Sequence, residues 1–317
     1  MRPNSLRDSG VLGSNVKKLY PRHISGGFLE IKAYAKLNLF LDVTGKRPDG
    51  YHNILSVMQT VDLFDELRLC KTKSASCFSF VSDSKEVPND ESNIVVRAAR
   101  LLIREYKIKE SFEIYLTKRI PVGAGLAGGS ADCAAALRGI DGLLNLNIPE
   151  DELQGIGKSL GADVPFCLIG GTCLAKGIGD RLTPLAPHPD CAIVLAYPDI
   201  HVSTKDIFGK LCLGEQKSNN IKFEKILSSL CNNELTGVAL SLYNVFMDLT
   251  SRDFPIITKL IGKLEACGAA GASMTGTGSA VFGYFEQESD AALAIDALVG
   301  DARTYLVKPV NKYCVRG

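Results

Sequence analysis

The stretch at residues 121–131, PVGAGLAGGSA, constrains the fold of this chain most. It places four glycines within seven residues and runs directly into an alanine-rich segment, residues 130–144, that predicts a helix. Glycine tolerates a positive φ and lets a ligand approach the backbone. The dipole of the following helix favours an anion at its start, and Ser130 or Asp132 is expected to cap that helix. The pattern predicts a phosphate-binding loop, with a tight strand-to-helix turn that binds nothing as the alternative.

The common phosphate-loop patterns do not explain this stretch. Gly123-x-Gly125-x-x-Gly128 matches the dinucleotide fingerprint, which requires a β-α-β unit. The segment that follows the helix begins Pro149-Glu-Asp-Glu and predicts a second helix instead of the required strand. The sequence does not match the spacing of the Walker A motif, and the protein-kinase motifs HRD and DFG are absent. A Rossmann oxidoreductase is therefore disfavoured, and the loop fits some other nucleotide-binding fold.

The length, net charge and cysteine and histidine content of the chain argue against several classes of protein. A chain of 317 residues can form two domains, and its net charge of +1 gives no reason to expect nucleic acid or a membrane as partner. Ten cysteines without a C-x-x-C pair and four scattered histidines indicate thiols in a reducing cytoplasm and no metal centre. Residues 1–28 are basic and acid-poor, so we expect a disordered leader, with a plastid transit peptide as the alternative.

Strict alternation predicts a long strand over residues 29–43, where every odd position is apolar. Its other face carries Tyr34, Lys36 and Asn38, and a solvated sheet face is the default interpretation of such a lysine. Further strands are expected at 57–69, 76–82 and 112–116, with a helix at 92–104 capped by Ser92 or Asn93. The first half is therefore expected to be an α+β layer.

The second half is expected to be a separate domain. Prolines at 184, 187 and 189 mark a boundary between residues 29–186 and 187–317. Strands at 191–197, 280–285 and 303–309 alternate with helices at 203–211, 221–230, 255–267 and 288–299, which predicts an antiparallel sheet backed by helices. A second glycine-rich loop is expected at 268–279. Asp163, between a helix end and an apolar stretch, has a structural role in a turn as its default interpretation.

Three motifs in this order resemble the galactokinase, homoserine kinase, mevalonate kinase and phosphomevalonate kinase (GHMP) superfamily. They are Ala33-Tyr-Ala-Lys36-Leu-Asn38-Leu, residues 121–131, and Gly271-Ala-Ser-Met-Thr-Gly-Thr-Gly278-Ser. The resemblance runs from about residue 29 to 310. It implies an α+β, two-domain GHMP-kinase fold, with an N-terminal domain like ribosomal protein S5 domain 2 and a ferredoxin-like C-terminal domain. It also implies ATP and Mg²⁺ as cofactors.

Within the superfamily, Arg47-Pro-Asp-Gly-Tyr-His52 and Gly161-Ala-Asp163-Val-Pro are similar to one group of kinases. That group phosphorylates the 2-hydroxyl of a cytidine diphosphate-linked methylerythritol in the non-mevalonate isoprenoid pathway. The resemblance implies that Asp163 orients the hydroxyl proton and that Lys36 offsets negative charge.

The same resemblance implies the binding residues. ATP contacts are expected at Asn93, Lys118 and the whole loop, that is, Pro121, Val122, Gly123, Ala124, Gly125, Leu126, Ala127, Gly128, Gly129, Ser130 and Ala131. Substrate contacts are expected at Asn38, Tyr51, His52, Thr204, Gly276 and Gly278, with Asp206 as a further candidate. The metal ligands stay open, and Ser130 is a candidate for Mg²⁺.

Two alternatives remain: a kinase for another small alcohol such as homoserine or mevalonate, and a non-catalytic nucleotide-binding relative. The Asp-Gly-Tyr-His loop argues against the first, because an aromatic platform suits a nucleobase. The presence of both Lys36 and Asp163 argues against the second. The protein is expected to be a monomer or a homodimer.

Overall fold

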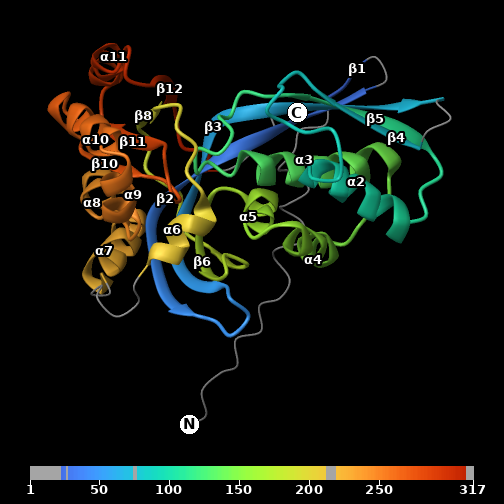
Figure 1. Cartoon of the computed structure of the whole chain (residues 1–317), viewed down its shortest axis with the longest axis horizontal. Helices are drawn as coiled ribbons and strands as arrows, with labels where there is room; N and C mark the ends of the chain where they lie inside the picture. The colour runs from blue at the N-terminus through green and yellow to red at the C-terminus, as the bar shows by residue number, and fades with distance from the viewer. Residues whose placement is uncertain (1–22, 26–27, 74–76, 212–218, 312–317) are drawn as a thin grey trace, which may run out of the picture.

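The computed structural model describes residues 23–25, 28–73, 77–211 and 219–311. Two β-sheets, one of eight strands and one of four, lie side by side with helices around them (Figure 1). The chain changes sheet between β7 (Arg181–Pro184) and β8 (Ala192–Tyr197), where the domain boundary at residues 186 and 187 is predicted.

Two long antiparallel strands, β2 (Phe28–Lys46) and β3 (His52–Thr72), run through both halves of the molecule. A strand of this length spans roughly 60 Å at about 3.3 Å per residue. The apolar odd positions from residue 29 to residue 43 are all buried, as the alternation predicts. From Lys36 onward the even positions are buried too, because the second half of the chain covers that face. The expectation of a solvated face is therefore wrong beyond Tyr34.

The remaining strands of the eight-stranded sheet pair around β2 and β3. They are β1 (His23–Ser25) on β2, β5 (Ser111–Thr117) and β6 (Thr172–Gly177) on β3, β4 (Phe78–Ser82) parallel to β5, and β7 on β6. The expected disordered leader, residues 1–28, stays a prediction, and β1 occupies residues 23–25 of that segment. Residues 1–22 and 26–27 lie outside the described residues.

The first half also contributes four helices: α2 (Ile94–Glu105), α3 (Gly128–Leu144), α4 (Glu150–Leu160) and α5 (Val164–Ile169). Asn93 caps α2 as predicted, because its side chain accepts a hydrogen bond from Val95 N. Helix α3 begins after Ala127, which is left-handed (φ 55°), and has no side-chain cap. The predicted capping by Ser130 or Asp132 is wrong, since both residues lie inside the helix.

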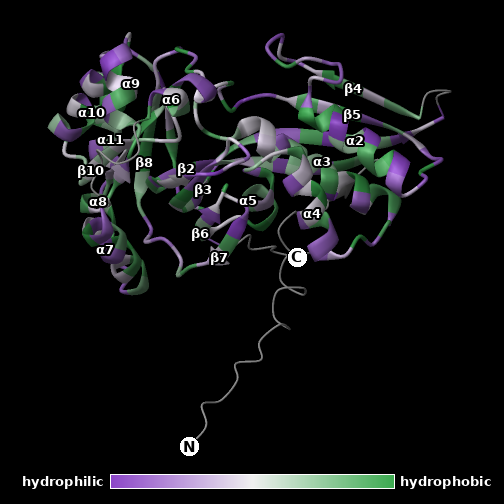
Figure 2. Ribbon diagram, turned by 60° about the horizontal axis from the view of Figure 1, so that its bottom comes forward, coloured by the Kyte–Doolittle hydropathy of each residue, from purple (hydrophilic) through white to green (hydrophobic). Residues whose placement is uncertain are grey.

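Helix α3 is the central helix of this half and packs directly on β2 and β3. The approach is close at Gly139, where a Cβ would lie 2.7 Å from Leu69 Cδ1. Figure 2 shows hydrophilic residues on the outer helices α2 and α4, whereas α3 is apolar over most of its length.

The four-stranded sheet has the order β10-β11-β8-β12, and all of its pairs are antiparallel. Its strands β10 (Gly271–Met274), β11 (Val281–Phe285) and β12 (Arg303–Val307) follow β8 in the β-α-β-β-α-β order of a ferredoxin-like domain, which confirms the expected fold. The helices of this half are α6 (Thr204–Lys210), α7 (Asn220–Cys231), α8 (Leu235–Leu240), α9 (Met247–Asp253), α10 (Ile256–Ala266) and α11 (Glu288–Ala297). The glycine loop expected at 268–279 is shorter than predicted, because β10 occupies residues 271–274.

Two segments of the second half return to the first sheet. Strand β9 (Tyr243–Asn244) pairs parallel with β2. After β12, residues 308–311 cross back to β3, and we call them the C-terminal strap. Val310 N donates to Thr60 O (2.8 Å), and Asp62 exchanges two hydrogen bonds with the backbone of Lys308. The two halves are therefore hydrogen-bonded to each other at both edges of the long strand pair.

The eight described cysteines are free thiols, and four of them are buried (Cys133, Cys167, Cys173 and Cys191). Cys212 and Cys314 lie outside the described residues. None of the described helices has both the length and the apolar composition that crossing a membrane requires.

Candidate active site

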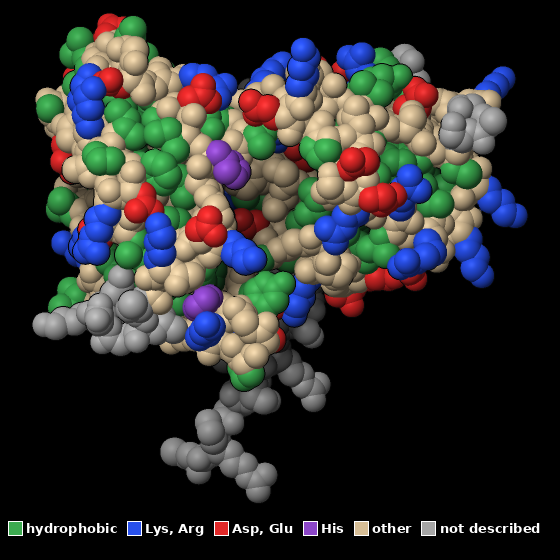
Figure 3. Space-filling view, in the orientation of Figure 1, with side chains coloured by type: hydrophobic (Ala, Val, Ile, Leu, Met, Phe, Trp, Pro, Cys, Tyr) green, Lys and Arg blue, Asp and Glu red, His purple; other side chains and the backbone are tan. Residues whose placement is uncertain are grey.

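The first glycine loop faces a cavity of about 1190 Å³ between the two halves. Figure 3 shows this hollow, with acidic side chains inside it and basic and histidine side chains around its mouth. All of the predicted site residues line it except two: the lining residues are residues 121–130, Lys36, Asn38, Tyr51, His52, Asn93, Lys118, Asp163, Thr204, Gly276 and Gly278. One exception is Ala131, whose side chain is buried in the core and whose N–H donates to Ala127 O. The other is Asp206, the further candidate for a substrate contact.

The glycine loop is held from outside through its carbonyl groups. Lys36 donates twice, from Nζ to Gly125 O and from its backbone N–H to Leu126 O. Tyr197 Oη donates to Val122 O, and Ala280 N donates to Ala124 O, so that all four bonds are 3.0–3.3 Å long. In a trans peptide the next residue's N–H points away from the carbonyl. The N–H groups of Gly123, Gly125 and Leu126 have no acceptor within the described parts of the chain. The loop is therefore prepared to bind an anion through its backbone.

The two glycine loops touch each other. Gly125 (φ +81°) lies so close to the second loop that a Cβ would be 2.4 Å from Thr275 O, and a Cβ at Gly276 (φ +59°) would be 3.0 Å from Gly125 O. Both positions need glycine for conformation and for space. Thr204 Oγ1 lies 3.1 Å from Thr277 Oγ1, so α6 is joined to the second loop as well.

Lys36 is placed by a break in the register of β2. Tyr34 pairs with Phe64 but Lys36 pairs with Thr60, and this irregularity frees the N–H of Lys36 for the glycine loop. The Lys36 side chain is 4% exposed, and its Nζ donates to Asn38 Oδ1 (2.5 Å) and Gly125 O (3.0 Å). Burial lowers the pKa of Lys36, and the charge of Asp163 acts in the opposite direction. A buried lysine with a shifted pKa at a cavity wall is typical of a functional site.

Asn38 holds Lys36 in place. Its Oδ1 also accepts from Gly276 N (3.0 Å), and its Nδ2 donates to Ser56 Oγ (2.9 Å). The Asn38 amide therefore connects Lys36 to the second glycine loop, while Lys36 itself bonds to the first loop through Gly125 O. The substrate contact predicted for Asn38 remains a prediction, and the structure gives its side chain a supporting role.

Asp163 immediately precedes α5 and lines the cavity, and its side chain does not cap that helix. Its charge is close enough to Lys36 to offset part of the lowering of the lysine's pKa that burial causes. The Ser130 hydroxyl lies near the segment that carries Asp163, because a Cβ at Gly161 would be 3.9 Å from Ser130 Oγ. A carboxylate, an amine and a hydroxyl thus meet beside the anion-binding loop.

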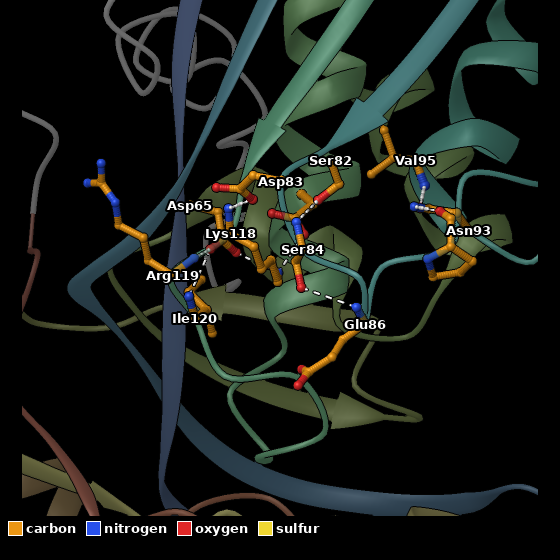
Figure 4. Close-up of polar contacts among 12 residues, drawn as sticks. Asp65, Ser82, Asp83, Ser84, Glu86, Asn93, Val95, Lys118, Arg119 and Ile120 are labelled. Carbon is orange, nitrogen blue, oxygen red and sulfur yellow. Dashed lines mark hydrogen bonds and ion pairs between the residues drawn. The ribbon is translucent and has the colours of Figure 1, made fainter.

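Lys118 lies in a buried charge cluster behind the loop. Its Nζ contacts Asp65 Oδ2 and Asp132 Oδ2, both at 2.6 Å. Asp65 also accepts from Arg119 N (2.5 Å) and Ile120 N (2.8 Å), so it fixes the segment that leads into the loop (Figure 4). Burial raises the pKa of Asp132 well above its usual value, against the effect of Lys118. Asn93 and Lys118 both line the cavity, but their polar atoms are largely bonded to protein groups.

The cavity is also lined by aromatic residues. Tyr51 is 60% exposed, and the rings of His52 and Phe208 lie 5.1 Å apart. Burial and the nearby Lys46 lower the pKa of His52, so its ring is neutral at neutral pH. Phe208 and His201 also line the cavity, and the sequence did not single them out. Phe208 is one apolar position of a short amphipathic helix, a pattern that usually indicates core.

Comparison with known proteins identifies the family and the fold. The GHMP kinases N terminal domain model matches residues 93–171, and the GHMP kinases C terminal model matches residues 221–302. The chain therefore belongs to the GHMP kinases and is a small-molecule phosphotransferase, as the motifs predicted.

Its relatives narrow this further. The chain is 42% identical over 270 residues to the 4-diphosphocytidyl-2-C-methyl-D-erythritol kinase of Exiguobacterium sibiricum, covering 85% of this chain and 93% of that protein. It also resembles a crystal structure of 4-(cytidine 5'-diphospho)-2C-methyl-D-erythritol kinase, with a TM-score of 0.77, 32% identity, and coverage of 88% and 98%. Within the GHMP kinases, it belongs to the 4-diphosphocytidyl-2-C-methyl-D-erythritol kinases. A homoserine kinase from Cytophaga hutchinsonii shares the fold alone, with a TM-score of 0.71 and 20% identity, covering 93% of this chain and 98% of that one.

Proposed function

We propose that this kinase transfers the γ-phosphoryl group of ATP to the 2-hydroxyl of 4-diphosphocytidyl-2-C-methyl-D-erythritol. The observation that carries the proposal is one cavity lined by two chemically different sets of residues. The glycine loop, Lys36 and Asp163 form one set, and Tyr51, His52 and Phe208 form the other. An anion-binding loop suits a triphosphate, and an aromatic group with a neutral imidazole suits a pyrimidine base.

In the proposed reaction Asp163 accepts or orients the proton of the acceptor hydroxyl. Lys36, fixed by Asn38 and Gly125 O, offsets the negative charge that surrounds the transferring group. Phosphoryl transfer has a loose transition state, so positioning and charge neutralisation supply most of the catalysis. The backbone N–H groups of the loop hold the phosphates while the two side chains act.

Mg²⁺ fits the site through the nucleotide. Within the described residues there is no group of three or more His, Cys, Asp or Glu side chains that could hold a metal. Mg²⁺ commonly binds through substrate phosphates and one or two protein oxygens, and Ser130 Oγ lies beside the Asp163 segment. When bound, Mg²⁺ would neutralise phosphate charge, with Ser130 as the proposed protein ligand.

The test is an ADP-release assay with the diphosphocytidyl acceptor, homoserine and mevalonate as separate substrates. We expect turnover with the cytidyl acceptor and little with the other two alcohols. Equal turnover with homoserine or mevalonate would contradict the assignment. ATP binding without turnover of any acceptor would favour a non-catalytic relative.

The proposed location is the cytoplasm, supported by the free thiols of the described cysteines. A plastid location depends on residues 1–22, which lie outside the described residues. A monomer or a homodimer remains the expected state.

A further inference from the structure

One histidine of the cavity wall has no part in the proposed chemistry. His201 lies between β8 and α6 and lines the cavity. Its imidazole rests on the first glycine of the phosphate loop, because a Cβ at Gly123 would lie 2.0 Å from His201 Nδ1 and 2.6 Å from Cε1. The second half of the chain thus places a ring with two nitrogens directly against the loop.

The backbone on both sides of this histidine is fixed. Ile200 O accepts a hydrogen bond from Ser279 Oγ, the Val202 side chain is buried, and Ser203 caps α6. The ring nitrogens, by contrast, bond to no other residue in the described ranges, and the residue is exposed. His201 therefore has unused hydrogen-bonding capacity at a fixed place on the cavity wall.

The lysine that contacts the loop and the lysine behind it already have protein partners. Lys36 donates to Asn38 and Gly125, and Lys118 lies between two carboxylates. A bound polyphosphate needs more donors than the loop backbone supplies, and imidazole donates at least one N–H in either protonation state. Beside Gly123, whose own N–H has no acceptor in the described chain, His201 is placed to supply that donor.

We propose that His201 is a phosphate-contacting residue, contributed by the second half of the chain, that donates an N–H to a phosphate oxygen of a bound ligand. The inference rests on the proposed kinase function. Phosphate oxygens come from two sources in this reaction, ATP and the diphosphate of the acceptor. The contact with the ATP-binding loop favours ATP.

Calorimetric titrations can separate these sources. ATP (with Mg²⁺), adenosine, cytidine 5′-diphosphate and cytidine are each titrated into the wild type, His201→Ala and His201→Asn. Lys210→Ala is the matched control, because Lys210 is on the same helix-bearing segment but outside the cavity, paired with Asp253. Thermal melting confirms that each variant is folded.

We expect His201→Ala to lower the affinity for ATP about tenfold or more, which is the effect of losing one hydrogen bond to a charged group. The affinity for adenosine should not change. His201→Asn, which keeps an N–H donor, should recover part of that loss. A loss confined to cytidine 5′-diphosphate would support the contact and assign it to the acceptor. Unchanged affinity for both phosphorylated ligands, or equal losses for the nucleosides, would overturn the inference. A wild type that binds no ATP would contradict the proposed function itself.

Discussion

Replacing Lys118 with methionine tests how the loop is supported from behind. The side chains of Lys118, Asp65 and Asp132 are at most 6% exposed, and the amine lies 2.6 Å from each carboxylate. Removing the amine leaves the buried carboxyl groups of Asp65 and Asp132 without their cationic partner. Breaking a buried ion pair in this way typically costs about 3–5 kcal/mol. For a chain of 317 residues, with an unfolding entropy of about 2.1 cal/mol/K per residue, that corresponds to a fall in melting temperature of roughly 5–8 °C.

The matched control is Lys210→Met, which removes the same charge from an exposed pair with Asp253. Exposed pairs contribute about 1 kcal/mol or less, so this variant should melt within a few degrees of the wild type. Asp132→Asn should also be mild, because burial already raises the pKa of Asp132 and favours its neutral form. All three melts are measured at pH 7.5 by scanning calorimetry.

Two results would refute this account. Equal melting temperatures for Lys118→Met and Lys210→Met would mean that the cluster contributes no more than a surface ion pair. Equal melting temperatures for Asp132→Asn and Lys118→Met would mean that the Asp132 charge is essential. A further check is acidification to pH 5. It should reduce the difference in melting temperature between Lys118→Met and the wild type, because protonation neutralises the unpaired carboxylates.

Three further predictions follow from the site and the core. Asp163→Asn should lower turnover by about 10²–10⁴-fold while ATP affinity by calorimetry stays within twofold of wild type, as expected for the loss of a general base; near-normal turnover would exclude that role. Phe208→Ala should weaken cytidine 5′-diphosphate by about 1–3 kcal/mol, the range for base stacking, with no change for ATP, and an equal loss for both would disprove the base platform. Burial lowers the pKa of His188 from 6.5 to about 4, so the folded protein holds this side chain in its neutral form. Its contribution to stability is complete above pH 6.5 and falls by about 3 kcal/mol as the pH drops toward 4; His188→Gln should lose this part of the pH dependence in urea titrations, and an unchanged pH profile would contradict it.

Local patterns predicted most of the elements. Alternation located β2 and its buried odd positions, and the order of glycine loops and apolar segments located the two sheets. The same alternation could not show that Lys36 and Asn38 are buried, because the residues that contact them lie far along the chain. Lys36 contacts Gly125, 89 positions later, and Asn38 contacts Thr275 and Gly276, more than 200 positions later. Burial of a polar face depends on a distant partner, which a periodicity does not contain.

The errors at the glycine loops have a similar origin. Ser130 and Asp132 are good capping residues, but α3 begins at Gly128, directly after the left-handed Ala127, so both residues lie inside the helix. Asp132 then meets Lys118 and Asp65, a residue 67 positions before it in sequence. The catalytic pair was predicted through resemblance to a family, since spacing alone gave Asp163 a turn role.

The C-terminal strap has a consequence for how the protein is made. Residues 308–311 supply hydrogen bonds to Thr60 and Asp62, in a strand that leaves the ribosome some 250 residues earlier. Nascent domains generally fold as units from the N-terminus. Here Thr60 and Asp62 stay without these partners until residues 308–311 have been synthesised. A chain cut just after β12 would still contain Lys36, Asp163 and both glycine loops. It would differ from the longer chain by an unpaired edge of β3 at Thr60 and Asp62, a surface on which another strand could pair.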